Sequence, residues 1–357
     1  MLSAQSDIAR EVDSAFAWIG GICLVLLVGI TLAMVLFLVR YRRSRHPRPA
    51  RIEGHLGLEI TWIVIPTLLV LFMFFKGYKG FRMMRDVPPN AMVVDVVAQR
   101  WFWTFTYPAA SVSADQLYVP VDRPVKLQLT SPETDVVHSL YLPAFRVKED
   151  CVPGRGTYLW FQAERVGIYN IFCAEYCGRD HSSMLTKLHV LSPPDYERWL
   201  ADQIAAKNKP IVIEQAMDPR SEDIVACDAP SLFRTYCVSC HGADGTGGLI
   251  ENARDFTRLD GWKRSSKVTD IYRTLSLGIE GTQMRPFPNL RPWDRFALAH
   301  HVAAFYAAAD RPVATDEEIQ ALVKEYALDQ LPIPRDTISI EESMHAIAAE
   351  AAAEEGG

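Results

Sequence analysis

An uncharged apolar run near the start of the chain limits what this protein can be. Ser14–Val39 contains no charged side chain, and about 20 apolar residues are enough for a helix to cross a bilayer. A second, shorter apolar run lies at Ile60–Phe75. We therefore expect a multidomain membrane protein that begins with a hairpin of two transmembrane helices, at about 14–39 and 58–77.

The loop between the two runs predicts the orientation of this hairpin. Residues Arg40–Arg51 contain six arginines and no acidic residue, and short loops rich in arginine stay on the cytoplasmic side of a membrane. Both termini and everything after Lys76 are then periplasmic, with the spans in a bacterial inner membrane. A signal sequence is the alternative for the first run, but that run lacks a basic segment before it and exceeds the usual apolar length.

Length and charge suggest several units rather than one. The chain has 357 residues and a formal net charge of −6, whereas single domains commonly have 100–200 residues. Eleven of the acidic residues, against only Lys324 and Arg335, lie after Pro312. We expect an acidic tail there. The predicted divisions are a periplasmic N-terminus with the hairpin (1–90), a β-domain (91–195), a helix and linker (196–226), a second domain (227–312) and the tail (313–357).

The segment from Ala91 to Leu191 is typical of an all-β domain. It contains short runs of β-forming residues separated by Pro, Gly and Asp, a pattern that predicts a sandwich or Greek-key barrel. The expected strands are Met92–Val97, Trp101–Tyr107, Pro124–Leu129, Tyr158–Gln162, Gly167–Phe172 and Leu185–Val190. A short helix at Pro194–Lys207 follows, and the later segment is rich in helices and loops up to an apolar run at Phe296–Ala309.

Four of the seven cysteines fall in two spacings with defined cofactor chemistry. The first spacing, Cys173 and Cys177, is followed by His181 and Met184, a soft and borderline donor set that favours copper. Two thiolates this close can bridge a pair of copper ions. A second imidazole has to come from upstream, where His138 is available, with His189 as a competitor inside a predicted strand. A structural zinc site would leave the methionine without a role.

At these residues the chain resembles subunit II of cytochrome c oxidase. The resemblance rests on Asp135-Val-Val-His-Ser139, on the Cys-x3-Cys-x3-His-x2-Met run and on the membrane hairpin, and it covers about residues 10–200. It implies a cupredoxin-like fold and a dinuclear copper (CuA) centre. The implied ligands are His138, Cys173, Cys177, His181, Met184 and the backbone carbonyl of Glu175. The carboxylate of Glu175 matches a ligand to a magnesium ion at the boundary with subunit I. Leu140 and Tyr141 depart from the usual family residues, which affects local packing only.

Two more positions take their expected roles from this resemblance. Gln99-Arg-Trp-Phe-Trp103 is similar to the family's aromatic patch, in which Trp101 matches the residue that accepts electrons. The alternative is that both tryptophans are core residues on one face of a strand. Glu59, at the cytoplasmic end of the second span, matches the mouth of a proton-uptake path. Its alternative is a solvated carboxylate at a helix end.

The second cysteine spacing, Cys237-Val-Ser-Cys-His241, is the attachment signature for covalent haem c. Both thiols form thioethers to the haem, and His241 supplies one axial ligand. Met284, in a loop rich in Gly and Pro, is the expected second ligand, while His300 and His301 are expected to be surface or packing residues. The region resembles a small all-α class I cytochrome c domain, although Met-Arg-Pro replaces the common Met-Pro.

These observations predict the electron-accepting subunit of a terminal haem–copper oxidase. The expected partners are subunit I, subunit III, a periplasmic donor such as cytochrome c, and lipid, with no nucleic acid. The same module in a nitric-oxide-reducing enzyme is the first alternative, and a free-standing membrane-bound electron carrier is the second. The cysteines outside the two spacings are Cys23, Cys151 and Cys227, and a Cys151–Cys227 disulfide is conceivable in an oxidising compartment.

Overall fold

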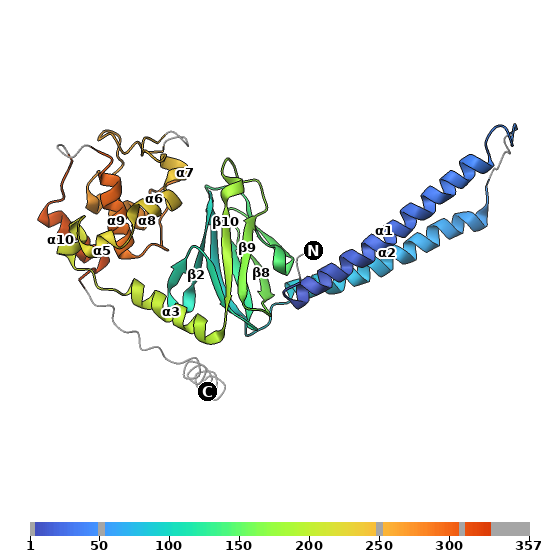
Figure 1. Ribbon diagram of the computed structural model, residues 1–357, viewed down its shortest axis with the longest axis horizontal. Helices are drawn as coiled ribbons and strands as arrows, with labels where there is room; N and C mark the ends of the chain where they lie inside the picture. Colours follow the sequence, from blue (N-terminus) through green and yellow to red (C-terminus); the bar gives the residue numbers. More distant parts are fainter. Residues whose placement is uncertain (1–3, 49–53, 248–252, 307–310, 330–357) are drawn as a thin grey trace, which may run out of the picture. The chain divides into compact units, whose positions relative to one another are not determined.

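The computed structural model describes residues 4–48, 54–247, 253–306 and 311–329. The chain divides into two compact units, with the boundary along the chain after Gln203. The first unit contains a helical hairpin followed by a β-domain, and the second is a set of short helices, which we call the helical domain (Figure 1). Most of the predicted acidic tail, from residue 330 onward, lies outside the described residues.

The hairpin consists of α1 (Asp7–Arg40) and α2 (Leu56–Arg85). Both helices are long and apolar enough to cross a membrane. They are longer than the predicted spans because the helical hydrogen bonding continues into polar turns at their ends. At the start of α1 the Ser6 side chain accepts a hydrogen bond from the Ala9 backbone N–H at 3.1 Å, a helix cap that satisfies an otherwise unpaired donor.

Ion pairs hold the periplasmic ends of the hairpin on the β-domain. Arg146 Nε donates to Asp13 Oδ1 at 2.9 Å, and Arg10 Nη1 donates to Glu164 Oε2 at 2.7 Å. From α2, Arg85 Nη1 donates to Glu149 Oε2 at 2.6 Å. The β-domain is therefore held on the hairpin by contacts from both helices as well as by the chain itself.

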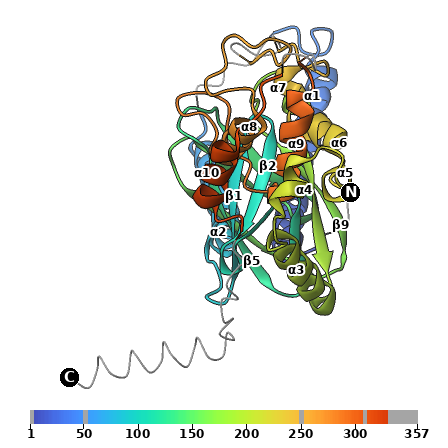
Figure 2. The same cartoon turned by 90° about the vertical axis from the view of Figure 1, so that its left-hand side faces the viewer.

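The β-domain is a sandwich of two five-stranded sheets. In the first sheet the strand order is β3-β2-β1-β5-β8, and in the second it is β4-β10-β9-β6-β7. Figure 2 labels β1, β2 and β5 of the first sheet and β9 of the second. The strands are β1 (Met92–Gln99), β2 (Phe102–Tyr107), β3 (Val112–Ala114), β4 (Leu117–Pro120), β5 (Pro124–Thr130), β6 (His138–Leu142), β7 (Val147–Cys151), β8 (Thr157–Gln162), β9 (Gly167–Cys173) and β10 (Leu185–Leu191). Two neighbouring pairs, β1 with β5 and β4 with β10, are parallel. The predicted sandwich with a cupredoxin-like fold is confirmed.

Alternation along the strands builds the core between the sheets. In β1, Val94, Val96 and Ala98 are fully buried while the residues between them are partly exposed, as expected when successive side chains point to opposite faces. The largest fully buried side chains of the domain include Trp103 and Phe105 from β2. Burying a side chain of this kind stabilises the fold by about 1.5–3 kcal/mol.

A helix leads out of the β-domain and is fixed to it by aromatic stacking. The helix α3 (Pro193–Lys207) begins directly after β10. Trp199 on this helix stacks on Tyr118 with ring centroids 4.3 Å apart, and Tyr118 stacks in turn on His189 at 4.5 Å. His189 Nε2 also lies 2.6 Å from Gln116 Oε1. These contacts give His189 a packing role at the edge of the sheet, away from the cysteines.

The helical domain contains seven helices in the described residues. They are α4 (Ile213–Met217), α5 (Glu222–Val225), α6 (Ala229–Tyr236), α7 (Val238–His241), α8 (Val268–Leu277), α9 (Pro292–Ala303) and α10 (Asp316–Tyr326). The apolar run expected to extend to residue 309 is helical only as far as Ala303, and residues 307–310 lie outside the described part of the chain.

One of the two cores of this domain includes residues on both sides of its predicted limits, 227 and 312. Ala216 and Ile224, before the predicted start, pack with Leu322, after the predicted end, against Tyr272 and other buried side chains. Ala216 and Leu322 are completely buried. The first part of the predicted acidic tail is thus an amphipathic helix that closes the core.

Candidate functional site

The first candidate site lies where two neighbouring strands of the second sheet meet a loop. His138 is the first residue of β6, and Cys173 is the last residue of β9, the strand that pairs with β6. The chain then runs through Cys177 to a short 3-10 turn at His181–Ser183. Two strand ends thus fix one imidazole and one sulfur, while the loop supplies the remaining groups.

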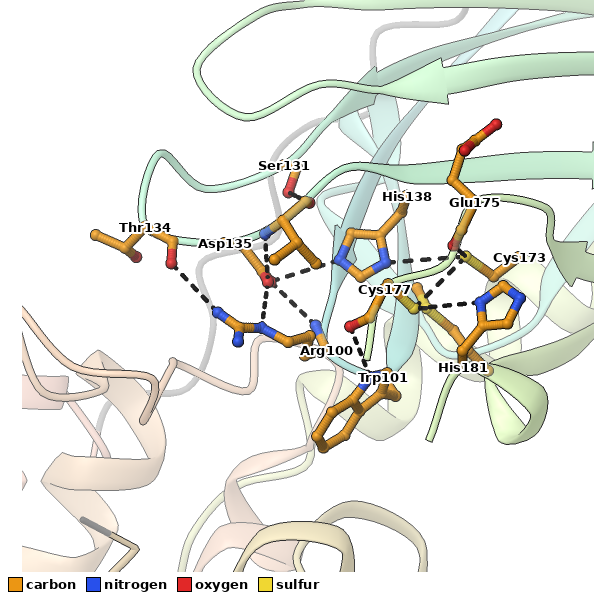
Figure 3. Close-up of polar contacts among 12 residues, drawn as sticks. Arg100, Trp101, Ser131, Thr134, Asp135, His138, Cys173, Glu175, Cys177 and His181 are labelled. Atoms are coloured by element: carbon orange, nitrogen blue, oxygen red, sulfur yellow. Dashed lines mark hydrogen bonds and ion pairs between the residues drawn. The ribbon is translucent and has the colours of Figure 1, made fainter. Parts of the chain in front are cut away.

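Four of the five side chains expected to bind copper converge at this place, and they are His138, Cys173, Cys177 and His181 (Figure 3). The sulfurs of Cys173 and Cys177 are 3.8 Å apart. The Nδ1 atom of His138 is 3.9 Å from the Cys173 sulfur, and Nδ1 of His181 is 3.5 Å from the Cys177 sulfur. The Met184 sulfur lies 3.8 Å from that of Cys177. Two sulfurs are therefore flanked by one imidazole each, with a thioether beside them.

The backbone carbonyl of Glu175 completes this cluster. It lies 3.2 Å from the Cys173 sulfur, while the Glu175 carboxylate points away and lies 3.0 Å from Lys148 Nζ (Figure 3). Backbone and side chain of the same residue thus face different surroundings. Lys148 was not singled out from the sequence, since nothing in β7 marks it until the strand is placed beside residues 173–184. We call these residues, which carry four of the expected ligand side chains, the copper loop.

Only one of the two thiols ionises readily by itself. Burial opposes ionisation of Cys173, but hydrogen bonding to His138 and to backbone groups outweighs it and lowers the pKa of that thiol to about 6. Burial, together with the negative charge on Cys173, raises the pKa of Cys177 to about 12. Because two thiolates repel each other in a buried site, a bound cation is what allows both to be charged.

An acidic residue that the sequence did not mark as functional orients His138. The Nε2 atom of this fully buried imidazole lies 3.7 Å from Asp135 Oδ2. Asp135 also accepts hydrogen bonds from the Arg100 backbone N–H at 3.0 Å and from Arg100 Nε at 2.6 Å. Burial opposes charge on Asp135, but the nearby His138 imidazole and hydrogen bonds from Val136 and Arg100 outweigh it and lower the pKa of the carboxyl. A carboxylate behind a metal-binding histidine fixes the ring orientation.

The two tryptophans of the aromatic patch do not share one role. Trp101 precedes β2 and is half-buried, and its Nε1 donates to the Cys177 carbonyl at 3.1 Å. Trp103 is buried in the core, 1% exposed, and donates to the Met184 carbonyl at 3.5 Å. Both indoles contact the copper loop, but only Trp101 lies between that loop and solvent. Of the two tryptophans, Trp103 is thus the one that fits the alternative interpretation, in which the aromatic patch consists of core residues.

The second candidate site lies in the helical domain. Cys237 joins α6 to α7, and Cys240 and His241 lie within α7. His241 Nδ1 donates to the Arg254 carbonyl at 3.0 Å and the ring stacks on Phe256 at 4.3 Å, which leaves Nε2 for a metal ion. Burial lowers the pKa of His241 despite the Arg254 contact, so the imidazole is neutral, the form that binds metals.

Met284 belongs to the same part of the helical domain as the two cysteines. It packs, partly buried, against the core cluster that contains Cys237, Phe256 and Leu298. His300 Nε2 donates to the Ala216 carbonyl at 2.9 Å, and His301 packs on Phe233 with ring centroids 5.1 Å apart. Both histidines of α9 therefore have packing partners.

The remaining predicted positions lie apart from both clusters. Glu59 is in the first turn of α2, following the cap residue His55. A carboxylate at this place suits the positive end of the helix dipole, in agreement with both the proton-path interpretation and the solvated helix-end interpretation. Cys151 is a buried free thiol in β7, and Cys227 is a free thiol in the helical domain.

Comparison with known proteins identifies the first unit. The model of the family "Cytochrome C oxidase subunit II, transmembrane domain" matches residues 1–79, and that of its periplasmic domain matches residues 111–190. The first unit of the chain matches both domains of the cytochrome c oxidase subunit II family. This unit thus combines a membrane anchor with the periplasmic domain of an electron-transfer subunit. The family assignment implies a copper site, and the Cys/His cluster fits it.

Curated relatives from several bacteria agree with this assignment. The chain is 27% identical over 249 residues to cytochrome c oxidase subunit 2 of Synechocystis, a match covering 56% of this chain and 74% of the relative. It is 29% identical over 238 residues to that of Alkalihalophilus pseudofirmus, covering 63% and 66%. The match to Cereibacter sphaeroides is 28% over 235 residues, covering 54% and 77%.

Among solved structures, the periplasmic domain of subunit II of the Bradyrhizobium japonicum cytochrome oxidase is similar. It is 27% identical, with a TM-score of 0.32, and the match covers 33% of this chain and 96% of that one.

Proposed function

We propose that this subunit accepts electrons from a periplasmic donor on a covalent haem c in its helical domain. They continue to the dicopper centre in the β-domain and then to a haem of subunit I, where oxygen reduction is coupled to proton pumping. The proposal also includes a bacterial inner membrane as the location of the complex and subunit III as a further partner. No residue of this chain is assigned to oxygen chemistry.

The observation that carries the copper assignment is the pair of sulfurs 3.8 Å apart with a flanking imidazole on each side. Sulfur and imidazole donors suit copper better than magnesium or calcium. When bound, a thiolate-bridged copper pair shares one transferred electron between two ions. The proposed ligands are His138, Cys173, Cys177, His181, Met184 and the carbonyl of Glu175.

The protein's own contribution at this site is a rigid and dry frame. Cys173, Cys177 and His138 are buried, so water has little access to the metal position. His138 and Cys173 belong to paired strands, and Asp135 holds the imidazole from behind. Ligands that are held in place before and after electron transfer need little rearrangement, which is what a fast relay requires.

The haem c assignment rests on the attachment signature together with its surroundings. Cys237 and Cys240 would hold the haem through thioethers, and His241 and Met284 are the proposed axial ligands. Haem c supplies one-electron redox chemistry when attached. The neutral His241 with Nδ1 bonded to a carbonyl, and the apolar cluster shared by Cys237 and Met284, support this reading.

Three further roles belong to the proposal. Glu59 starts a proton-uptake path into subunit I from the cytoplasmic side. Glu175 contributes its carboxylate to a magnesium ion at the boundary with subunit I, where Lys148, 3.0 Å away, competes for the same carboxylate. Trp101, placed between solvent and the copper loop, accepts electrons that arrive directly at the β-domain.

The test is metal and haem analysis of the full-length chain beside two cysteine variants. We expect two copper ions and one covalent haem per chain. Cys177→Ser should abolish the mixed-valence copper signal in electron paramagnetic resonance, because one thiolate cannot bridge the pair. Cys151→Ala removes a buried thiol of the same domain that lies outside the cluster and should keep the signal.

Three results would contradict the proposal. They are an intact mixed-valence signal in Cys177→Ser, a single copper ion per wild-type chain, or haem that solvent extraction removes. Purification from native membranes tests the complex as a whole. Subunit I and oxygen consumption should accompany this chain, whereas nitric oxide reduction, or purification of the chain alone, would assign it to another function.

A further inference from the structure

A glycine at the end of α8 has a backbone conformation that few other residues adopt. Gly278 follows Leu277 with φ of 68° and ψ of −162°. This combination lies in a region of backbone space that is essentially restricted to glycine, because a Cβ atom would collide with neighbouring backbone atoms. The chain leaves the helix at this point and enters the loop that carries Met284.

The backbone of the Met284 segment comes back against the same glycine. A Cβ atom placed on Gly278 would lie 2.7 Å from the Met284 carbonyl oxygen, 2.7 Å from the Arg285 carbonyl carbon and 2.8 Å from the Pro286 nitrogen. Real Cβ contacts essentially never fall below 3.0 Å. All three atoms belong to the main chain, so no side chain can turn aside to make room.

Hydrogen bonds close the loop around this contact. The Ile279 N–H donates to the Met284 carbonyl at 2.7 Å, and the Phe287 N–H donates to the Leu275 carbonyl at 2.9 Å. Arg264 Nη1 donates to the Gly278 carbonyl at 3.2 Å from the other side. The backbone of the Met284 segment is therefore held on the end of α8, with Gly278 at the point of closest approach.

We propose that Gly278 is a positioning residue for the axial methionine of the haem. This inference rests on the proposed function, in which Met284 ligates the iron. A thioether binds iron only over a narrow range of backbone positions, even though the methionine side chain is flexible. A side chain at residue 278 pushes the Met284 backbone off α8 and takes the sulfur away from the iron, while the cysteine attachment and His241 are unaffected.

A second glycine of the same loop offers a matched control. Gly281 also has a left-handed φ, 73°, but a Cβ atom there would meet nothing within 4 Å. Alanine at either position strains the local backbone, whereas only alanine at 278 collides with the Met284 segment. A general effect of losing a loop glycine should appear equally in both variants.

The experiment uses the full-length chain carrying its covalent haem, as wild type, Gly278→Ala, Gly281→Ala and Met284→Ala. Carbon monoxide binds ferrous haem c only when the sixth ligand has left. We expect a carbonyl spectrum and a lower reduction potential in Met284→Ala and Gly278→Ala, because loss of a thioether ligand disfavours ferrous iron. Wild type and Gly281→Ala should bind no carbon monoxide. Covalent haem content should be equal in all four chains.

The outcomes separate this inference from the function on which it rests. If Met284→Ala behaves as wild type, Met284 is not the ligand and the haem assignment itself is wrong at that position. If Met284→Ala binds carbon monoxide but Gly278→Ala does not, or if Gly281→Ala does so equally, the positioning role is overturned.

A milder variant decides the question if Gly278→Ala does not accumulate as a folded chain. Arg264→Gln removes the exposed donor to the Gly278 carbonyl without adding atoms near the loop. A carbonyl spectrum in Arg264→Gln, which wild type does not give, supports the positioning role, and the absence of that spectrum overturns it.

Discussion

The indole Nε1 of Trp101 donates a 3.1 Å hydrogen bond to the backbone carbonyl of Cys177, one of the two residues whose sulfurs are proposed to bridge copper. The ring also packs close to Gly178, where a Cβ atom would lie 3.3 Å from Trp101 Cζ2. A half-buried aromatic ring is thus bonded directly to the copper loop. This contact connects solvent to the metal ligands through one side chain and one hydrogen bond.

We expect Trp101→Phe to slow electron transfer from an external donor into copper. The variant keeps an aromatic ring but loses the bond to Cys177, and a slowing of about tenfold corresponds to about 1.4 kcal/mol of barrier. Stopped-flow reduction of the copper centre measures it. Trp160→Phe, in β8, is the control and should be reduced at the wild-type rate. Equal rates in all three proteins would remove Trp101 from the path.

Asp135→Asn should weaken copper binding while leaving the β-domain folded. The carboxylate lies 3.7 Å from His138 Nε2, and loss of a partner behind a metal ligand typically costs about 10–100-fold in metal affinity. Competition with a copper chelator measures the change. Glu133→Gln, an exposed neighbour, should bind as wild type does. An unaltered copper affinity in Asp135→Asn would show that Asp135 only binds Arg100 and does not support His138 as a ligand.

Glu59→Ala should slow oxygen consumption without slowing reduction of copper. The residue lies in the first turn of α2, at the end of the hairpin opposite to the β-domain, where it would pass protons rather than electrons. Oxygen uptake and flash-initiated copper reduction in one preparation separate the two steps. Glu11→Gln, in α1, should change neither rate. Wild-type turnover of Glu59→Ala would favour a merely solvated helix-end carboxylate.

Leu322→Ala should destabilise the helical domain by about 2–5 kcal/mol, the usual range for removing a buried leucine side chain. Leu322 is completely buried in α10 and packs with Tyr272 and Phe296. Urea unfolding of the full chain, followed through the haem spectrum, measures the loss. Gln320→Ala, exposed on the same helix, should have little effect. Equal urea unfolding midpoints for Leu322→Ala and wild type would show that α10 does not stabilise the helical domain.

Cys227 should remain a slowly reacting thiol rather than half of a disulfide. Burial raises its pKa to about 12, above that of an ordinary thiol, so the folded chain keeps it neutral until the pH approaches that value. Alkylation is carried by the thiolate and should accelerate about tenfold per pH unit between about pH 7.5 and 10, without a plateau. Mass spectrometry after alkylation measures it. A plateau near pH 8.5, or a peptide linked to Cys151, would contradict the assignment.

Local patterns in the sequence determined the hairpin, the sandwich and both cysteine clusters. An uncharged apolar run as long as Ser14–Val39 is typical of a helix that crosses a bilayer. The run of β-forming residues at Met92–Val97 predicted β1, because branched side chains fit well on a pleated sheet. Cys173, Cys177, His181 and Met184 lie within one loop, so their proximity follows from chain length alone.

Only the tertiary structure decided which distant residues act on these clusters. Arg100 reaches Asp135 from 35 residues away, and Lys148 reaches Glu175 because β7 and β9 both pair with β6, which no short pattern encodes. Charge composition assigned α10 to an acidic tail, yet Leu322 and Val323 bury its apolar face. No local pattern marks Gly278, because the collision of a Cβ atom there with the Met284 backbone depends on a loop that returns to the helix it left.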